Sequence, residues 1–264
     1  LDNSSWINRS YLYEADNGGG IRVYTFNGNT FTEITSVAVG DATYIWGDGT
    51  YIYLASGTSG LYAYTFDGST LTQVGFQAMT NAKSVWGDGT YLYATDGTAG
   101  LHALTFDGST FTIEDTFNTP DVAIGLWNDD TYLYIGDSAS GIRAYTFNGT
   151  TFTEEGNFNT PGTAASVWGD GTYLYVADLT GGIRAYTFDG STFTEVGSYS
   201  TADARDVWGD GIYIYLADNT DGVRAFTFSG TAFAEIDIEA SPADLRGVWG
   251  DGKYVYVAAG TNGI

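Results

Sequence analysis

Aspartates recur at two fixed positions of the chain and are the most numerous residues that could carry chemistry. Carboxylates beside backbone carbonyls can bind calcium, which takes oxygen ligands, and they can also accept hydrogen bonds from sugar hydroxyls. Aspartate in Asp-Gly turns instead caps its own turn by accepting backbone N–H groups. A requirement of the fold recurs in every unit, whereas a single site does not. We therefore expect turn capping at both sets and predict no cofactor, with calcium not favoured. The two sets are Asp48, Asp88, Asp129, Asp170, Asp210 and Asp251, and Asp16, Asp96, Asp137, Asp178 and Asp218.

Basic residues gather at one position, just ahead of a recurring tryptophan. Three of the nine basic residues stand there: Lys83, Arg205 and Arg246. In a chain of net charge −23, such a group could attract an anion or a carboxylate. Together with Asp206 and Tyr44, these residues form the predicted ligand-binding site. The alternative is local pairing of the arginines with Asp203, Asp206 or Asp244.

The single histidine, His102, offers no catalytic constellation. It occupies a position that holds arginine in four other units, so an exposed place on a strand is expected. No Ser-His-Asp arrangement can be assembled around it. No histidine cluster and no cysteine is present to ligate a metal. We therefore predict no metal site, no catalytic residues and no enzymatic activity.

Tryptophan marks an internal repeat of about forty residues. The spacings between successive tryptophans are 40, 40, 41, 41, 40 and 41 residues. Repeats of this length, with turn signals every ten residues or so, are typical of propeller blades. The tryptophans are Trp6, Trp46, Trp86, Trp127, Trp168, Trp208 and Trp249.

Each unit is predicted to form four short strands. In the unit that begins at Trp168, strands are expected over residues 173–177, 183–188, 192–198 and 205–208. β-branched and aromatic residues dominate these segments. Asp189-Gly190 between the second and third of them is a strong hairpin signal.

The fold class predicted is all-β, a β-propeller of four-stranded antiparallel blades. Tyr173 and Tyr175 point to one face of their strand, and Leu174 and Val176 to the other. Because both faces are apolar, each blade needs a neighbour on both sides. A β-solenoid is the rival, but the Asp-Gly hairpins favour antiparallel meanders. We expect one domain over residues 1–264, with repeats starting at about 6, 46, 86, 127, 168 and 208 and a partial repeat over 249–264.

The partial repeat predicts an open strand edge. Residues 249–264 align with 168–183, so the last unit has no counterpart of the third and fourth strands. A seven-bladed ring is the favoured architecture, with the last blade incomplete in this chain. Either the native chain supplies the remaining strands, or a neighbouring molecule, another copy included, supplies them by strand addition. A closed six-bladed ring ranks third.

The repeats resemble two propeller families. The run Tyr173-Leu174-Tyr175-Val176-Ala177-Asp178, followed by Gly182-Ile183-Arg184-Ala185-Tyr186, is similar to YVTN and LVIVD repeats. Such propellers occur in secreted and surface-layer proteins of bacteria and archaea. The chain departs from the YVTN pattern in its Trp-Gly-Asp-Gly turn and its Thr-Phe-Asp-Gly-Ser-Thr segment. The resemblance implies a propeller at an extracellular or cell-surface location, without a specific activity.

Composition narrows the class of partner. A pI near 4.1 disfavours nucleic acid as a partner, and no apolar run is long enough for membrane insertion. The leading prediction is a non-enzymatic extracellular or cell-surface scaffold for protein binding or assembly. The alternative is a multivalent, lectin-like propeller that binds glycans. A lactonase or hydrolase of the propeller type ranks last.

Overall fold

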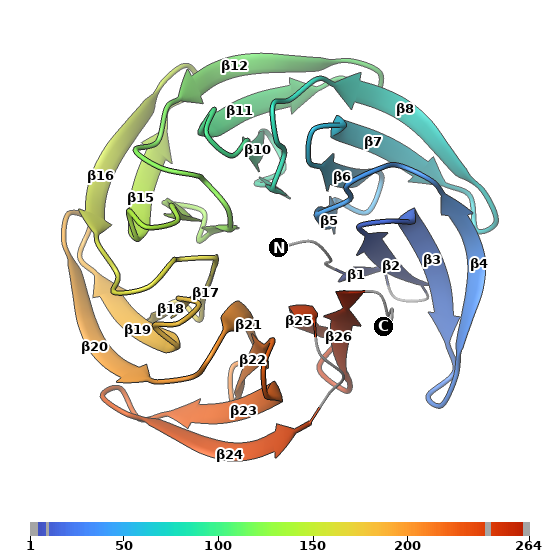
Figure 1. Ribbon diagram of the computed structural model, residues 1–264. Coiled ribbons are helices and arrows are strands. Elements are labelled where there is room, and N and C mark those ends of the chain that lie inside the picture. Colours follow the sequence, from blue (N-terminus) through green and yellow to red (C-terminus); the bar gives the residue numbers. More distant parts are fainter. Residues whose placement is uncertain (1–4, 9–10, 241–243, 261–264) are drawn as a thin grey trace.

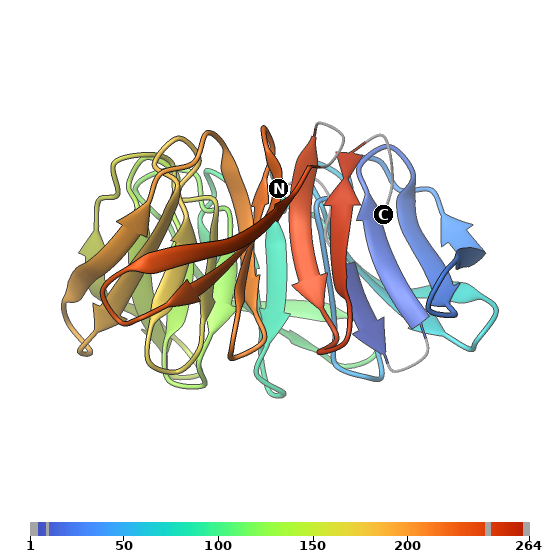
Figure 2. The ribbon, with the colours of Figure 1, turned by 90° about the horizontal axis from the view of Figure 1, so that it is seen from below.

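The computed structural model is a ring of β-sheets around a central axis (Figure 1). It describes residues 5–8, 11–240 and 244–260. These residues form six four-stranded antiparallel sheets and one two-stranded sheet. Figure 2 shows the ring from the side, with the strands of each sheet running between its two faces. The described part of the chain has no helix that is long and apolar enough to cross a membrane.

Blades are numbered in chain order, and each begins with its innermost strand. Every complete blade is a four-stranded meander. Blades 1 to 3 contain β1 (Ser5–Asn8), β2 (Tyr11–Asp16), β3 (Gly20–Phe26) and β4 (Phe31–Val37); β5 (Tyr44–Gly47), β6 (Ile52–Ser56), β7 (Gly60–Phe66) and β8 (Leu71–Gln77); and β9 (Ser84–Gly87), β10 (Leu92–Thr95), β11 (Leu101–Phe106) and β12 (Phe111–Phe117).

The remaining strands repeat the same order. Blades 4 to 6 contain β13 (Leu126–Asn128), β14 (Leu133–Gly136), β15 (Ile142–Phe147) and β16 (Phe152–Phe158); β17 (Ser166–Gly169), β18 (Leu174–Ala177), β19 (Ile183–Phe188) and β20 (Phe193–Tyr199); and β21 (Ala204–Gly209), β22 (Ile214–Asp218), β23 (Gly222–Phe228) and β24 (Phe233–Glu239). The two-stranded sheet, here the partial blade 7, contains β25 (Leu245–Gly250) and β26 (Val255–Ala259).

The predicted all-β propeller of four-stranded antiparallel blades is confirmed. The predicted strand over 183–188 coincides with β19. The other predicted strands differ by one residue, at one end from β18 and at both ends from β20 and β21. Six complete blades and a two-stranded sheet are present in the described residues. A ring of seven full blades therefore stays a prediction.

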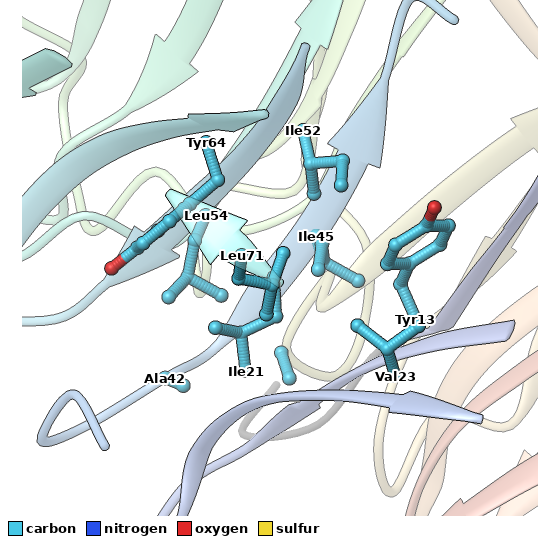
Figure 3. Close-up of a cluster of buried hydrophobic side chains, with 10 residues drawn as sticks. Tyr13, Ile21, Val23, Ala42, Ile45, Ile52, Leu54, Tyr64 and Leu71 are labelled. Atoms are coloured by element: carbon cyan, nitrogen blue, oxygen red, sulfur yellow. The ribbon is translucent and has the colours of Figure 1, made fainter. Parts of the chain in front are cut away.

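The core lies between the blades. Figure 3 shows one such interface, where Tyr13, Ile21 and Val23 of blade 1 meet Ile45 and Leu54 of blade 2. Similar clusters fill the following interfaces. Both faces of blades 2 to 5 are thereby removed from water. This burial is the main force that holds the ring together.

An edge-to-face aromatic contact repeats at the blade interfaces. The ring of Tyr173, just before β18, lies 5.1 Å from that of Phe228 at the end of β23. The same contact joins partial blade 7 to blade 1, with 5.1 Å between the ring centroids of Phe26 and Tyr254. Such geometry places the positive edge of one ring on the negative face of the other. At this aromatic contact, the two-stranded sheet therefore packs against blade 1 in the same way as a complete blade packs against the next one.

Glu14 breaks the repeat in blade 1. The equivalent positions in the other blades hold aliphatic residues, such as Leu54 and Leu216. Glu14 is 1% exposed, and one of its carboxylate oxygens accepts a hydrogen bond from the Tyr24 hydroxyl at 3.0 Å. The other oxygen has no hydrogen-bond partner in the described residues. Burial raises the pKa of Glu14 to about 7, because the ionised form loses its hydration.

Replacing Glu14 by leucine should change how stability depends on pH. A folded-state pKa above the unfolded value means that stability is fully present below about pH 4.5 and falls as pH rises toward 7. The loss amounts to roughly 3 kcal/mol. The stabilising effect of Glu14→Leu should therefore be larger at pH 8 than at pH 4.5, as measured by denaturant unfolding. Glu14→Gln keeps the shape of the side chain and removes its charge, so it should show the same pH dependence as Glu14→Leu. If the difference in unfolding free energy between Glu14→Leu and the native chain did not depend on pH, the raised pKa of Glu14 would be contradicted.

Candidate functional site

The innermost strands lie around the central axis of the ring (Figure 1), and the space that their side chains line there is called the channel below. Side chains alternate along a strand, so the residue two places before each tryptophan lies on the same face as the tryptophan ring. A cavity of about 90 Å³ lies inside this channel. Its polar lining comes from Tyr44, Ser166 and Asp206. Its apolar lining includes the rings of Trp86, Trp127, Trp168, Trp208 and Trp249.

Among the described residues that line this cavity, Asp206 is the only one with a carboxylate. Its Oδ1 accepts hydrogen bonds from Ser166 Oγ at 2.6 Å and from the Val207 amide at 3.0 Å. Its Oδ2 accepts the amide of Val248 at 2.9 Å. The three donors belong to blade 5, blade 6 and partial blade 7 respectively. The carboxylate is thus fixed in position by three inner strands.

A β-bulge sets the direction of the Asp206 side chain. The pairing of β21 with β22 shifts register between Ala204 and Asp206. Bulges leave one residue unpaired and redirect the side chains beside it. A similar shift occurs between Leu245 and Gly247 in β25. The strand that donates the Val248 amide therefore has a bulge at the position equivalent to the bulge in β21.

The surroundings of Asp206 make its carboxyl a weaker acid than that of an exposed aspartate. The side chain is half-buried and encircled by protein atoms, and this burial raises the pKa of its carboxyl. The three hydrogen bonds oppose the shift without cancelling it. Burial, with the nearby Asp206 charge, also raises the pKa of Tyr44. At neutral pH the Tyr44 hydroxyl is therefore a neutral hydrogen-bond donor that lies close to a carboxylate.

The structure separates the five residues that the sequence grouped together. Tyr44 and Asp206 share the cavity, whereas the three cations are not part of its lining. The Arg205 guanidinium lies 2.8 Å from Asp203, and that of Arg246 lies 2.6 Å from Asp244. Lys83 is half-buried at the start of the inner strand region of blade 3.

Ser166 was not among the predicted site residues. It stands at the same position of its repeat as Asp206 and Tyr44, two residues before the tryptophan. That shared position is the signal that could have identified it. The hydrogen bond of Ser166 to Asp206 crosses from blade 5 to blade 6, a contact that requires the rotation between adjacent blades.

The repeated aspartates have structural partners. Asp170 shows the pattern of the first set: Oδ1 accepts the amides of Thr172 and Tyr173 at 2.8 Å, and Oδ2 accepts the Tyr175 hydroxyl at 2.9 Å. The first set therefore caps the turn and anchors the buried tyrosine of the second strand. Equivalent bonds are made by Asp48, Asp88, Asp129, Asp210 and Asp251.

The second set of aspartates pairs mainly with the third strand. Asp178 accepts a hydrogen bond from Arg184 Nε at 3.1 Å, and the same guanidinium reaches Glu195 on the fourth strand at 2.9 Å. Blade 3 places His102 where the arginine stands. The prediction that His102 is exposed is wrong, because the ring is buried and contacts Thr116 Oγ1 at 2.8 Å and Asp96 Oδ2 at 3.3 Å. Within the described residues, no group of three His, Cys, Asp or Glu side chains is arranged to hold a metal ion.

Several solved structures have the same fold. Two bacterial proteins named "putative 6-phosphogluconolactonase" match at 17% identity. The one from Bacteroides fragilis has a TM-score of 0.77 over 92% of this chain and 84% of its own. The one from Bacteroides uniformis has a TM-score of 0.78 over 91% and 85%. A chain of a nidogen–laminin complex matches at 18% identity with a TM-score of 0.64, over 88% and 93%. No family model and no curated protein matches the sequence.

These neighbours correct the functional prediction. The expectation of a non-enzymatic scaffold, and of no enzymatic activity, rested on the near-identity of the blades and on the missing constellation around His102. The finding that overturns it is the match to the two Bacteroides propellers, whose names describe lactonases. The propeller fold implied by the resemblance is confirmed, while YVTN or LVIVD membership and an extracellular location stay predictions.

Replacing Asp206 by serine tests whether the ionised carboxylate of Asp206 lowers the stability of the fold. Serine stands at the equivalent position of blade 5, so the fold accepts it. Because burial raises the pKa of Asp206, its contribution to stability weakens as pH rises through that value. In thermal unfolding, the melting temperature of Asp206→Ser should therefore rise relative to that of the native chain as pH increases from 3 to 7. A melting temperature of Asp206→Ser that falls relative to that of the native chain as pH rises would contradict the electrostatic description.

Proposed function

We propose that this chain is a propeller hydrolase of the lactonase type, which opens a cyclic ester at the centre of the ring. The observation that carries the proposal is the Asp206 carboxylate, held in a channel cavity by three inner strands, with burial raising its pKa. A base with a raised pKa removes a proton from water more readily than an ordinary aspartate. The fold shared with the two Bacteroides propellers supports the same reaction class.

The reaction follows from the groups in the cavity. Asp206 takes a proton from a water molecule as the water oxygen bonds to the carbonyl carbon of the lactone. The carbonyl oxygen becomes negatively charged, and the neutral Tyr44 hydroxyl is the nearby donor that stabilises it. When the intermediate collapses, the bond between the carbonyl carbon and the ring oxygen breaks. The ring oxygen takes up the proton and becomes a hydroxyl, leaving an open-chain hydroxy acid.

The substrate proposed is a sugar lactone that carries an anionic group. Tryptophan rings around the cavity offer flat apolar surfaces to the C–H face of a sugar ring. Lys83, Arg205 and Arg246 are the cations proposed to attract the anionic group. Two of them are partly neutralised by Asp203 and Asp244, so Lys83 should contribute most to this attraction. The location outside the cell remains a further expectation.

Substituting Asp206 by asparagine should remove most of the activity. The two side chains have the same shape, but asparagine cannot accept the proton. We expect kcat/KM for glucono-δ-lactone or its 6-phosphate to fall roughly 100-fold or more, measured by proton release above the spontaneous rate. Asp210→Asn, in a turn of the same blade, is the matched control and should leave kcat/KM unchanged. An absence of hydrolysis by the native chain, or full activity of Asp206→Asn, would refute the proposal.

The same assay should identify the role of Lys83. Lys83→Gln should raise KM for the phosphorylated lactone several-fold and leave the unphosphorylated lactone unaffected, because only the former carries the anion. The effect should diminish at high salt, where the charges are screened. Lys253→Gln, at a turn in partial blade 7, is the control. Equal effects on both lactones would count against a phosphate contact.

A further inference from the structure

Blade 3 departs from other blades at a link between its third and fourth strands. In blade 5, the guanidinium of Arg184 on β19 joins Asp178 to Glu195 on β20. Blade 3 has His102 and Ile113 where blade 5 has this arginine and glutamate. Its third strand therefore carries a titratable ring in place of a permanent cation. The same link as in blade 5 is made in blades 1, 4 and 6 by Arg22, Arg143 and Arg224.

The ring of His102 lies between a hydroxyl and a carboxylate. Its Nδ1 is 2.8 Å from Thr116 Oγ1, and its Nε2 is 3.3 Å from Asp96 Oδ2. Thr116 stands directly opposite His102 in the pairing of β11 with β12. Asp96 immediately follows β10. Three segments of one blade thus bring a hydroxyl, an imidazole and a carboxylate into one row.

The carboxylate end of this row is fixed and ionised. Asp96 is 3% exposed, and its two oxygens accept the amide of Thr80 at 3.0 Å and the amide of Asn81. Burial raises the pKa of Asp96, but hydrogen bonds from His102 and from these amides outweigh it and hold the pKa below its usual range. An ionised carboxylate has no proton to donate, so the proton between it and the ring belongs to Nε2. Nδ1 of the neutral ring then accepts the Thr116 hydroxyl.

The hydroxyl end of the row faces solvent. Thr116 is exposed, whereas His102 is only 7% exposed. β12 is the outermost strand of blade 3 and lies at the rim of the ring (Figure 1). A molecule in solution can therefore reach the hydroxyl while the base stays shielded. A hydroxyl beside a base that a third group orients is the arrangement that activates serine and threonine as nucleophiles.

We propose that Thr116, His102 and Asp96 form a nucleophilic site on the rim of blade 3 that cleaves small activated esters. Thr116 is the nucleophile, and His102 is its general base. Asp96 is a positioning residue, because it holds the ring in the tautomer whose Nδ1 is unprotonated. Esters with a good leaving group are the class proposed, since attack from an exposed strand relies on the leaving group. The site is distinct from the channel and does not depend on the proposed lactone hydrolysis.

The reaction proceeds in two balanced steps. Thr116 Oγ1 bonds to the carbonyl carbon of the ester while its proton passes to Nδ1 of His102. The bond from this carbon to the leaving oxygen then breaks, the leaving oxygen takes the proton, and the acyl group remains on Thr116. In the second step water attacks the acyl carbon and gives a proton to Nδ1. The carboxylic acid departs, and Thr116 Oγ1 recovers the proton.

Acetylation by p-nitrophenyl acetate tests the nucleophile. The native chain should release p-nitrophenolate and carry acetyl on Thr116, detected by mass spectrometry of the digested chain after an acid quench. Thr112, an exposed threonine of the same strand, is the matched control and should be acetylated roughly 100-fold more slowly or less. Thr116→Val should lower the release of p-nitrophenolate. Absence of acetyl on Thr116 together with unchanged release by Thr116→Val would overturn the proposal.

Replacing His102 by arginine tests the base without disturbing the fold. Four other blades carry arginine at this position, so the melting temperature should be kept. Arginine remains protonated and cannot accept the proton. Acetylation of Thr116 in His102→Arg should therefore fall roughly 100-fold. Acetylation at the native rate in this variant would overturn the proposal.

The tautomer of His102 gives a readout that does not depend on activity. Because His102 is the only histidine of the chain, the nuclear magnetic resonance spectrum of ¹⁵N-histidine-labelled protein reports on this ring alone. The native chain should show a proton on Nε2, shifted downfield by its hydrogen bond to the carboxylate. Asp96→Asn should remove that downfield shift and slow the acetylation of Thr116. A native ring protonated on Nδ1 would be a donor to Thr116, and this result would overturn the proposal.

Discussion

Each blade of this protein has two apolar faces, and the structure depends on covering both of them. A four-stranded sheet with aliphatic and aromatic residues on each side cannot stand alone in water, so it packs between two neighbours. The ring is the arrangement in which blades 2 to 5 have a neighbour on both faces. Its cores lie between sheets, as where Leu54 of blade 2 packs against blade 1. The central axis is left to the inner strands, and chemistry can be placed there without disturbing the packing.

This constraint explains how much of the fold could be predicted. Alternation within each strand, Asp-Gly turns and a spacing of about forty residues are local features, so β19 was predicted with its observed bounds. Local features also account for the capping aspartates, since Asp170 bonds to the next few residues. His102 was misplaced because its partners come from other segments of the blade: Asp96 follows β10, and Thr116 lies in β12. Glu14 gave no signal, because its burial depends on how blade 1 packs.

The candidate site was only partly predictable. The position two residues before each tryptophan is visible in the sequence, and it includes Tyr44 and Asp206. What the sequence does not contain is the rotation between blades, which brings Ser166 and the Val248 amide onto Asp206. Nor does it contain the bulge at β21, which separates Asp206 from Arg205. The near-identity of the blades reflects their packing requirement, and it carries no information on whether the channel binds or catalyses.

The three donors to Asp206 have a consequence for how the ring comes apart. One carboxylate links blade 5, blade 6 and the two-stranded sheet, and the last of these has the smallest core. Small cores open at lower free energy than the rest of a protein. Detachment of β25 would remove the Val248 donor while the other blades stay folded. The hydrogen bonds of Asp206 therefore depend on whether the two-stranded sheet stays packed in the ring. A local opening of this sheet would disrupt them, although the total β-structure of the protein would change very little.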